Sequence, residues 1–335
     1  MTRPAVALAM VPFLTADLWG PAQRERLRAL ADVLDDEPLV RLDDARAEAL
    51  LPRAEVLLTG WGCPPVDEAV LARAPRLRAI VHAAGTVKNH VTPACYARGL
   101  SVTSAAAANA LPVAEYTLAA MLLAGKRLLR LRDRYRAARG FRLWPREEEG
   151  LGNYEKTVGL VGASMIGRRV LALLAPFDFE VLLYDPFVDA GEARRLGAEK
   201  VELEALMRRS EIVSLHAPAL PETRGMIGAR ELAWLRDGAT LINTARGSLV
   251  DHAALEAELV SGRIDAILDV TEPEVLPAGS PLYELPNVFL TPHVAGALGR
   301  ETRRLAELAL DELERFARGE AFRYEIRAED LARIA

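Results

Sequence analysis

Short apolar runs rich in β-branched residues alternate along the chain with longer segments rich in Ala, Leu, Arg and Glu. The runs have the length of buried strands, and the longer segments have the spacing of helices with one apolar face. We expect strands over 6–11, 56–59, 77–82, 157–161, 181–184, 212–215, 240–243, 264–270 and 288–291, with helices such as 24–34 and 255–260 between them. This alternation predicts an α/β protein with doubly wound parallel sheets, covered by helices on both faces.

Two segments interrupt this alternation. Residues 112–136 have the pattern of one long helix, and an irregular stretch follows at 140–153. Residues 302–316 have the pattern of a last helix that returns the chain to its first domain. We therefore expect a first domain formed by 1–108 and 299–335, interrupted by a second domain at 109–298.

Composition argues against several classes of protein. The net charge of −5 over 335 residues gives no electrostatic reason to expect nucleic acid or an anionic membrane as a partner. Cys63 and Cys95 have no second Cys or His at ligand spacing, so no metal site is predicted. No secretory signal is evident, and no apolar stretch approaches the roughly 20 residues that cross a bilayer. We expect a soluble cytoplasmic protein with reduced thiols.

One segment has the pattern of a dinucleotide-binding turn, in which a predicted strand runs into Gly162-Ala-Ser164-Met165-Ile166-Gly167 and a helix follows. Glycine at 162 permits a tight turn, and glycine at 167 lets the helix pack closely on the sheet. The free N–H groups at the helix start then face a pyrophosphate. Ser164 stands where a glycine usually lets the backbone approach the phosphates, and its hydroxyl can donate a hydrogen bond.

Asp185 ends the next predicted strand, about 20 residues further on, where a partner for a ribose 2′-hydroxyl is expected. Pro186 and Phe187 follow it, and no Arg is near enough in sequence to receive a 2′-phosphate. This arrangement favours NAD over NADP as the cofactor. A glycine turn beside a solvent-facing Asp is the alternative interpretation.

Three later segments, in this order, resemble the signature of the D-isomer-specific 2-hydroxyacid dehydrogenases: Leu241–Asp251 (LINTARGSLVD), Asp269–Glu274 (DVTEPE) and Thr291–Gly296 (TPHVAG). His216–Gly225 is similar to that family's loop beside the cofactor, and Val81–Asn89 sits where the family has its substrate loop. The resemblance implies a flavodoxin-like substrate domain interrupted by a Rossmann-type NAD-binding domain.

The resemblance also implies the residues of a reaction in which hydride moves between NAD(H) and a 2-hydroxy or 2-keto acid. His293 is expected to carry the proton, because imidazole titrates near neutrality. Glu274 would orient that ring and favour its charged form, and Arg246 would bind the substrate carboxylate and polarise the carbonyl. Glu274 is preferred to Glu272 because the family's acid lies five residues after the aspartate that ends its strand, here Asp269.

The remaining expected contacts follow from the same resemblance. Backbone N–H groups of Ala84, Gly85 and Thr86 are expected to bind the substrate carboxylate. The cofactor is expected to contact Gly162, Ser164, Met165, Ile166, Gly167, Asp185, His216, Thr244, Ala245, Asp269 and His293. For His216, a structural histidine at a strand end is an equal alternative. His82 and His90 are expected to border the substrate cleft.

Lys88 stands where many family members carry an acid, and Thr271 replaces a usual aromatic residue, so the particular 2-hydroxy acid is not implied. The leading hypothesis is an NAD-dependent oxidoreductase acting on a small 2-hydroxy or 2-keto acid. Oxidation of a small inorganic acid such as phosphite is an alternative on the same fold. A second alternative is an NAD-sensing interaction protein, similar to the transcriptional corepressors that resemble this family. A homodimer joined through the helix at 112–136 is expected.

Overall fold

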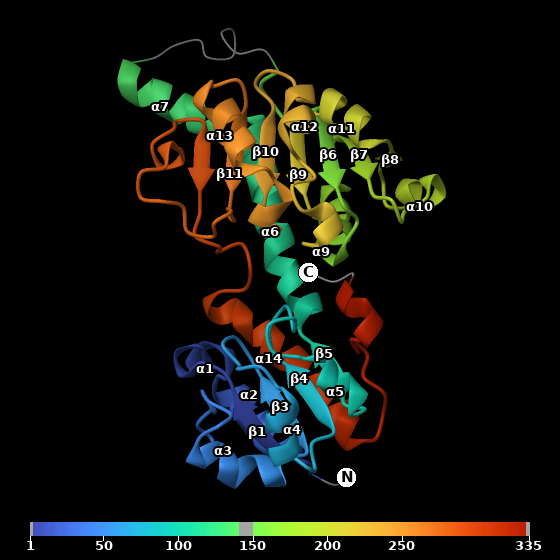
Figure 1. The fold of residues 1–335 in the computed structure, drawn as a ribbon. Coiled ribbons are helices and arrows are strands. Elements are labelled where there is room, and N and C mark those ends of the chain that lie inside the picture. Colours follow the sequence, from blue (N-terminus) through green and yellow to red (C-terminus); the bar gives the residue numbers. More distant parts are fainter. Residues whose placement is uncertain (1–2, 141–149, 333–335) are drawn as a thin grey trace. The chain divides into compact units, whose positions relative to one another are not determined.

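The computed structural model describes residues 3–140 and 150–332. The chain divides into two units, Met1–Asn109 with Ala297–Ile334 and Ala110–Gly296. Each unit has its own parallel sheet, drawn as arrows in Figure 1.

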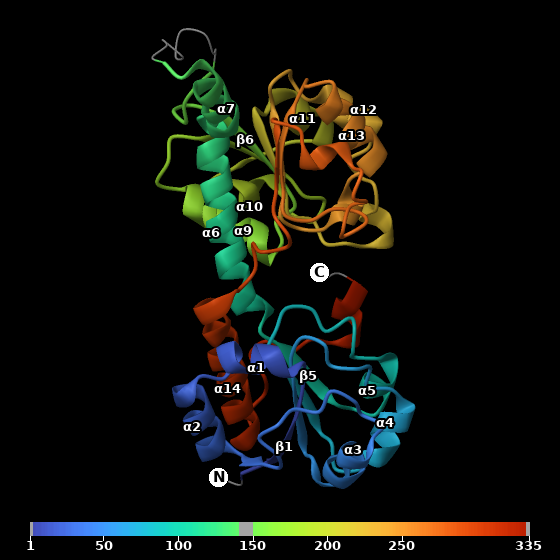
Figure 2. The same ribbon diagram turned by 90° about the vertical axis from the view of Figure 1, so that its left-hand side faces the viewer.

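The first unit contains a five-stranded parallel sheet in the order β2-β1-β3-β4-β5, which is the flavodoxin-like order. Its strands are β1 (Ala5–Ala9), β2 (Asp32–Val33), β3 (Val56–Thr59), β4 (Ala79–His82) and β5 (Ser101–Ser104). Figure 2 shows α2 (Pro21–Leu30) and α14 (Thr302–Ala317) on one face, and α3 (Ala45–Leu50), α4 (Glu68–Arg73) and α5 (Pro93–Ala97) on the other. The short helix α1 (Pro12–Leu18) precedes α2. Alternate strand residues fill the two core layers, with Leu58 packed toward α14 and Leu57 in the opposite layer.

The second unit contains a seven-stranded parallel sheet in the order β12-β11-β10-β9-β6-β7-β8. This is the Rossmann order extended by one strand, and its topological switch point lies between β6 and β9. The strands are β6 (Thr157–Val161), β7 (Glu180–Tyr184), β8 (Glu199–Lys200), β9 (Ile212–Leu215), β10 (Thr240–Asn243), β11 (Asp265–Leu268) and β12 (Val288–Leu290).

Helices cover both faces of this second sheet, as Figure 2 shows. One face carries α6 (Ala106–Gly125), α9 (Met165–Leu174) and α10 (Ala190–Arg195), and the other carries α11 (Leu203–Arg209), α12 (Ala229–Trp234) and α13 (His252–Val260). Helix α7 (Leu128–Ala138) follows α6. Short 3₁₀ turns occur at Leu51–Arg53, Pro221–Thr223, Gly247–Leu249, Pro281–Tyr283, Gly299–Glu301 and Ala328–Ala332.

The predicted doubly wound α/β fold is confirmed by both sheets. Strands β3, β6, β9 and β10 have the predicted bounds. The strand expected over 264–270 is shorter, because at Asp269 the chain turns into a loop that its own carboxylate holds. The short strands β2, β5 and β8 were not predicted.

The prediction of one long helix over 112–136 is wrong. The helix begins earlier, at Ala106, and ends at Gly125; Arg127 then adopts a left-handed conformation with a φ of 46° before α7 begins. The main-chain N–H of Gly152 donates to the carbonyl of Gly125 at 2.8 Å, and the Asn153 side chain donates to the carbonyl of Leu122 at 3.1 Å. These donors satisfy two of the last carbonyls of α6, and the N–H groups of Lys126 and Arg127 satisfy the carbonyls of Leu123 and Ala124. Residues 141–149 of the expected irregular stretch lie outside the described residues.

The expectation that no apolar stretch approaches the length of a membrane span is also wrong. Helix α6 has 20 residues and a mean hydropathy of 1.3, enough to cross a membrane by length and composition. Ala114, Ala120 and Met121 of this helix are buried against β6 and β10. Its apolar character therefore serves in part to cover the sheet of the second unit.

Candidate functional site

A glycine turn joins β6 to α9 at the switch point of the second sheet. Gly162 has a φ of 100°, and a Cβ there would lie 2.6 Å from the main-chain N of Ala217. A Cβ at Gly167 would collide with the carbonyl oxygen of Gly162. Both positions therefore require glycine, one for its conformation and both for the close approach of neighbouring backbone.

Ser164 is the N-cap of α9, and its Oγ accepts a hydrogen bond from the N–H of Gly167 at 3.4 Å. The hydroxyl thus satisfies one of the free N–H groups at the helix start. Met165 is half exposed and Ile166 is partly buried, and both stand in the first turn, where main-chain N–H groups lack helical acceptors. The remaining N–H groups and the positive end of the helix dipole suit a pyrophosphate.

The carboxylate of Asp185, directly after β7, contacts the same turn. Its Oδ2 accepts from the N–H of Ala163 at 2.7 Å, and its Oδ1 accepts from the N–H of Phe187 at 2.8 Å. Each carboxylate oxygen can still accept a further hydrogen bond, as a ribose hydroxyl requires. The cradle at Gly162 and Gly167, the capped helix start and this carboxylate together fit NAD.

His216 is fully buried behind the glycine turn. Its Nε2 lies 2.9 Å from Ser214 Oγ, while its Nδ1 has no partner among the residues that the structure describes. Burial lowers the pKa of His216 to about 3, so the ring is neutral at neutral pH. Its Cβ would lie 3.3 Å from a Cβ at Gly167, which shows how closely β9 and the turn pack.

Arg246 follows the carboxyl end of β10, after Thr244 and Ala245. Its Nη1 donates to the carbonyl of Ala245 at 2.7 Å, and Asn243 fixes the loop by donating from Nδ2 to the carbonyl of Arg246 at 2.8 Å. The buried Thr244 hydroxyl pairs with that of Thr117 on α6 at 2.9 Å. Burial lowers the pKa of Arg246 and the charge of Glu274 raises it. The guanidinium remains a cation at any working pH.

His293 and Glu274 face each other from the loops after β12 and β11. His293 Nδ1 lies 2.5 Å from Glu274 Oε1, and both side chains are about half exposed, at 51% and 55%. Glu272, by contrast, lies 3.9 Å from Arg224. His293 has a φ of 55°, an uncommon value for a residue with a side chain, and its N–H donates to the carbonyl of Asp269 at 2.9 Å. With Nδ1 on Glu274, Nε2 is the ring nitrogen left to meet a ligand.

Asp269 is buried and holds the loop that carries His293. Its Oδ1 accepts from the Thr291 hydroxyl at 2.5 Å and from the N–H of Val294 at 2.8 Å, and its Oδ2 accepts from the N–H of Ala295 at 2.9 Å. These bonds join Asp269 to the loop after β12 and hold the shape of that loop.

Gly247 is where the loop of Arg246 approaches the loop of Glu274 most closely. A Cβ at this position would collide with the carbonyl group of Thr271 and lie 2.6 Å from the N of Glu272. The Thr271 hydroxyl lies 2.7 Å from the carbonyl of Pro273 and 3.0 Å from that of Glu274, and can donate to either. The sequence did not predict the close approach of Gly247 and Thr271, because the two residues lie in different loops.

Ala84, Gly85 and Thr86 lie in the loop after β4 of the first unit. Ala84 is fully buried, and Gly85 and Thr86 are partly buried. Within residues 3–140 and 150–332, the N–H groups of these three residues have no hydrogen-bond acceptor. These N–H groups are therefore available to donate to an anion. His82 and His90 are buried beside this loop, at 3% exposure each, and their expected place at the border of the substrate cleft stays a prediction.

Comparison with known proteins identifies the family. Residues 118–295 match the NAD binding domain of the D-isomer specific 2-hydroxyacid dehydrogenases. The chain is 36% identical over 273 residues to D-3-phosphoglycerate dehydrogenase of Mycobacterium leprae, covering 80% of this chain and 50% of that protein. It is 34% identical over 331 residues to glyoxylate reductase of Aeropyrum pernix, covering 95% and 94%. The structure of the TT0316 protein from Thermus thermophilus has a TM-score of 0.76 at 29% identity, covering 96% and 99%.

The chain belongs to the D-isomer specific 2-hydroxyacid dehydrogenase family, and its second unit contains the family's NAD-binding domain. The predicted family and the predicted cofactor, NAD, are thereby confirmed. The chain spans about half the length of the phosphoglycerate dehydrogenases that it matches.

Proposed function

We propose that the protein transfers hydride between NAD(H) and a small 2-hydroxy or 2-keto acid, with His293 as the general acid and base. The observation that carries this proposal is the 2.5 Å contact between His293 Nδ1 and Glu274 Oε1, which leaves Nε2 for the substrate. A bound nicotinamide supplies or accepts the hydride. The protein must then transfer one proton, bind the substrate carboxylate and stabilise the charge that develops on the keto oxygen.

In the reducing direction, His293 donates the Nε2 proton to the keto oxygen as the C–H bond forms, and solvent later returns a proton to the ring. Glu274 accepts a hydrogen bond from Nδ1–H and thereby holds the ring in the orientation that presents Nε2 to the substrate. In the oxidising direction, the neutral ring accepts the hydroxyl proton. The left-handed backbone at His293 and the bonds to Asp269 keep the ring in place during both directions.

Arg246 is proposed to bind the substrate carboxylate and to stabilise charge on the keto oxygen. Its guanidinium is partly buried, so its field is less screened by water than that of a surface arginine. The planar fork matches the geometry of a carboxylate. The contact of Ala84, Gly85 and Thr86 with the same substrate stays a prediction, and their unpaired N–H groups support it.

The test is NADH oxidation, followed by absorbance, over a panel of 2-keto acids with two to five carbons. We expect turnover with NADH and much slower turnover with NADPH, because Asp185 would repel a 2′-phosphate. The Asp185→Ser variant is expected to show a smaller difference between its turnover with NADH and its turnover with NADPH. NADH binding with no turnover across the panel would contradict the proposed reaction. Equal turnover with both cofactors would contradict the role given to Asp185.

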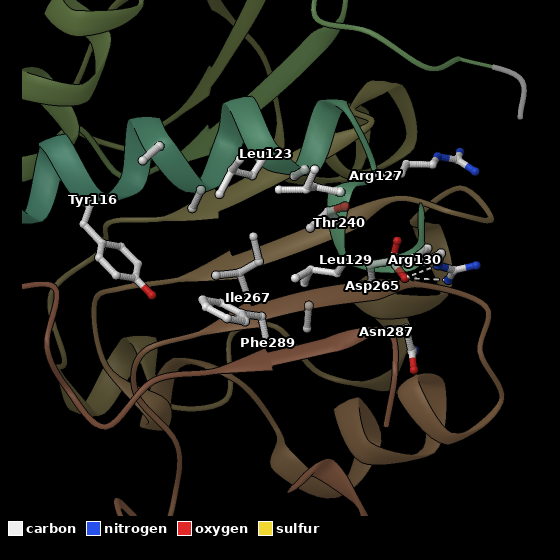
Figure 3. Close-up of a pocket in the computed structure, with 15 residues that line it drawn as sticks. Tyr116, Leu123, Arg127, Leu129, Arg130, Thr240, Asp265, Ile267, Asn287 and Phe289 are labelled. Carbon is white, nitrogen blue, oxygen red and sulfur yellow. Dashed lines mark hydrogen bonds and ion pairs between the residues drawn. The ribbon is translucent and has the colours of Figure 1, made fainter. Parts of the chain in front are cut away.

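We also propose that the protein forms a homodimer in the cytoplasm, with α6 and α7 in the contact. Figure 3 shows a pocket between these helices and strands β10 to β12, lined mainly by apolar side chains. Leu123, Leu128 and Phe289 of this pocket are 46%, 45% and 39% exposed. Contiguous exposed apolar surface is typical of a subunit interface. Light scattering on the protein as it elutes from a size-exclusion column is expected to give the mass of a dimer. The Leu123→Glu variant is expected to elute as a monomer, whereas Phe13→Glu, on the first unit, is expected to remain a dimer.

A further inference from the structure

A buried cluster of one threonine and two histidines lies at the carboxyl edge of the sheet in the first unit. Thr59 and His82 end β3 and β4 and are register partners across the two strands. Thr59 Oγ1 lies 2.8 Å from His82 Nδ1 and 3.2 Å from His90 Nε2, and the two rings are 4.4 Å apart between centroids. None of the three residues is more than 3% exposed.

Both rings are neutral at neutral pH. Burial and the neighbouring His90 lower the pKa of His82 well below its ordinary value, and burial lowers the pKa of His90 to about 4. A neutral imidazole has one donor and one acceptor nitrogen, and a hydroxyl has one proton. The hydrogen bonds in this cluster must therefore run in one consistent direction.

The cluster joins both ends of the loop after β4. His82 ends β4, His90 lies at the far end of the loop, and Thr59 Oγ1 contacts a ring nitrogen of each. Main-chain bonds support the same connection, since the N–H of Ala83 donates to the carbonyl of Thr59 at 2.8 Å and the N–H of His90 donates to the carbonyl of Val87 at 3.1 Å.

The loop held in this way is the one whose N–H groups at Ala84, Gly85 and Thr86 have no acceptor among the described residues. A peptide unit is planar, so its carbonyl and its N–H point in opposite directions. The N–H of Ala105 donates to the carbonyl of Ala84 at 3.0 Å, and this bond therefore also fixes the N–H of Gly85.

We propose that the Thr59–His82–His90 cluster is a positioning device that holds the loop after β4 in the conformation that binds the substrate carboxylate. The inference rests on the proposed function, since it assigns the loop to that substrate. Without the Thr59 hydroxyl, two buried nitrogens lose their partner and the side-chain connection between the two ends of the loop is lost. The loop then has to be ordered by the substrate itself, which weakens binding.

The test compares Thr59→Val, which keeps the shape and removes the hydroxyl, with Thr59→Ser, which keeps the hydroxyl. We expect Thr59→Val to raise KM for the 2-keto acid about tenfold, the size of one lost buried hydrogen bond. Its kcat at saturating substrate and its affinity for NADH, measured by fluorescence, should stay within about twofold, because neither depends on an already ordered loop. Thr59→Ser is expected to match the wild type.

Hydrogen exchange over residues 83–91 tests the cluster without any reference to the reaction. The inference predicts faster exchange there in Thr59→Val and in His90→Gln than in Thr59→Ser, with the rest of the first unit unchanged. A wild type without 2-keto acid turnover would contradict the proposed function, and the exchange result would still decide whether the cluster orders the loop. Equal KM in Thr59→Val and Thr59→Ser, or equal exchange over 83–91, would overturn the inference.

Discussion

Two glutamates stand two positions apart in one loop, and their side chains have different partners. Glu274 Oε1 is 2.5 Å from His293 Nδ1, whereas Glu272 pairs at 3.9 Å with Arg224. If Glu274 orients the catalytic ring, its charge contributes to the reaction and that of Glu272 does not. The pair therefore offers two matched substitutions within the same loop.

We predict that Glu274→Gln lowers kcat by about 10- to 100-fold, because a neutral amide binds the Nδ1–H of the ring more weakly than a carboxylate does and holds its orientation less firmly. Glu272→Gln is expected to stay within about twofold of wild type. The measurement is steady-state NADH oxidation with the best 2-keto acid of the panel. Similar losses in both variants would argue against a specific role for Glu274.

At the scale of elements, the site depends on how closely three loops at the carboxyl edge of the second sheet approach one another. Gly247, in the loop after β10, contacts the backbone at Thr271, in the loop after β11. The loop after β12 is joined to them through Asp269. A side chain at 247 would separate the loops that carry Arg246 and Glu274.

We predict that Gly247→Ala destabilises the second unit by about 1–3 kcal/mol, the usual cost of overpacking, and lowers turnover as well. Gly279→Ala is the matched control, because a Cβ at that exposed position meets no atom within 4 Å. Urea unfolding followed by circular dichroism measures the stability of each variant. A Gly247→Ala protein as stable and as active as Gly279→Ala would show that the close approach of these two loops contributes to neither stability nor turnover.

The sequence predicted the elements whose apolar pattern is local. Strands β3, β6, β9 and β10 were predicted at their observed bounds because each is a short buried run between polar turns. The break between α6 and α7 was not predicted, and its contacts with Gly152 and Asn153 come from elsewhere in the chain. Helical periodicity continues across that break in the sequence.

In the candidate site, too, the residues in local motifs were predicted and the contacts between distant segments were not. His293, Glu274 and Arg246 were identified from ordered motifs, and the structure places all three at one edge of the second sheet. The burial of His82 and His90 was not foreseen, because only the register of β3 and β4 brings Thr59 between the two rings. The sequence contains no local signal for that contact.

At the scale of the whole molecule, buried neutral histidines in both units couple stability to pH. The pKa of His90 in the first unit falls to about 4, and that of His216 in the second falls to about 3, against an ordinary value of 6.5. Between these values and 6.5 the unfolded chain binds more protons than the folded one. The contribution of these neutral rings to the free energy of unfolding is therefore fully present above pH 6.5. It is lost as the pH falls toward 4.

We predict that each pH unit below 6.5 removes up to about 1.4 kcal/mol of stability for each ring that stays neutral when folded. Urea unfolding at pH 7.5, 6 and 5 measures this loss, in a range above the ordinary titration of carboxylates. In the His216→Asn variant, the stability of the second unit is expected to change less with pH than in the wild type. Stability that does not change between pH 7.5 and 5 would contradict the neutral state assigned to these rings.

The central claim is that His293 carries the proton of a hydride transfer to a 2-keto acid. The most direct measurement is turnover of NADH and a 2-keto acid by wild type and His293→Ala, with NADH affinity determined for both. The account predicts that kcat falls by about 10²- to 10⁴-fold while NADH affinity is retained, as for the loss of a general acid. A His293→Ala protein that keeps the wild-type kcat would contradict it.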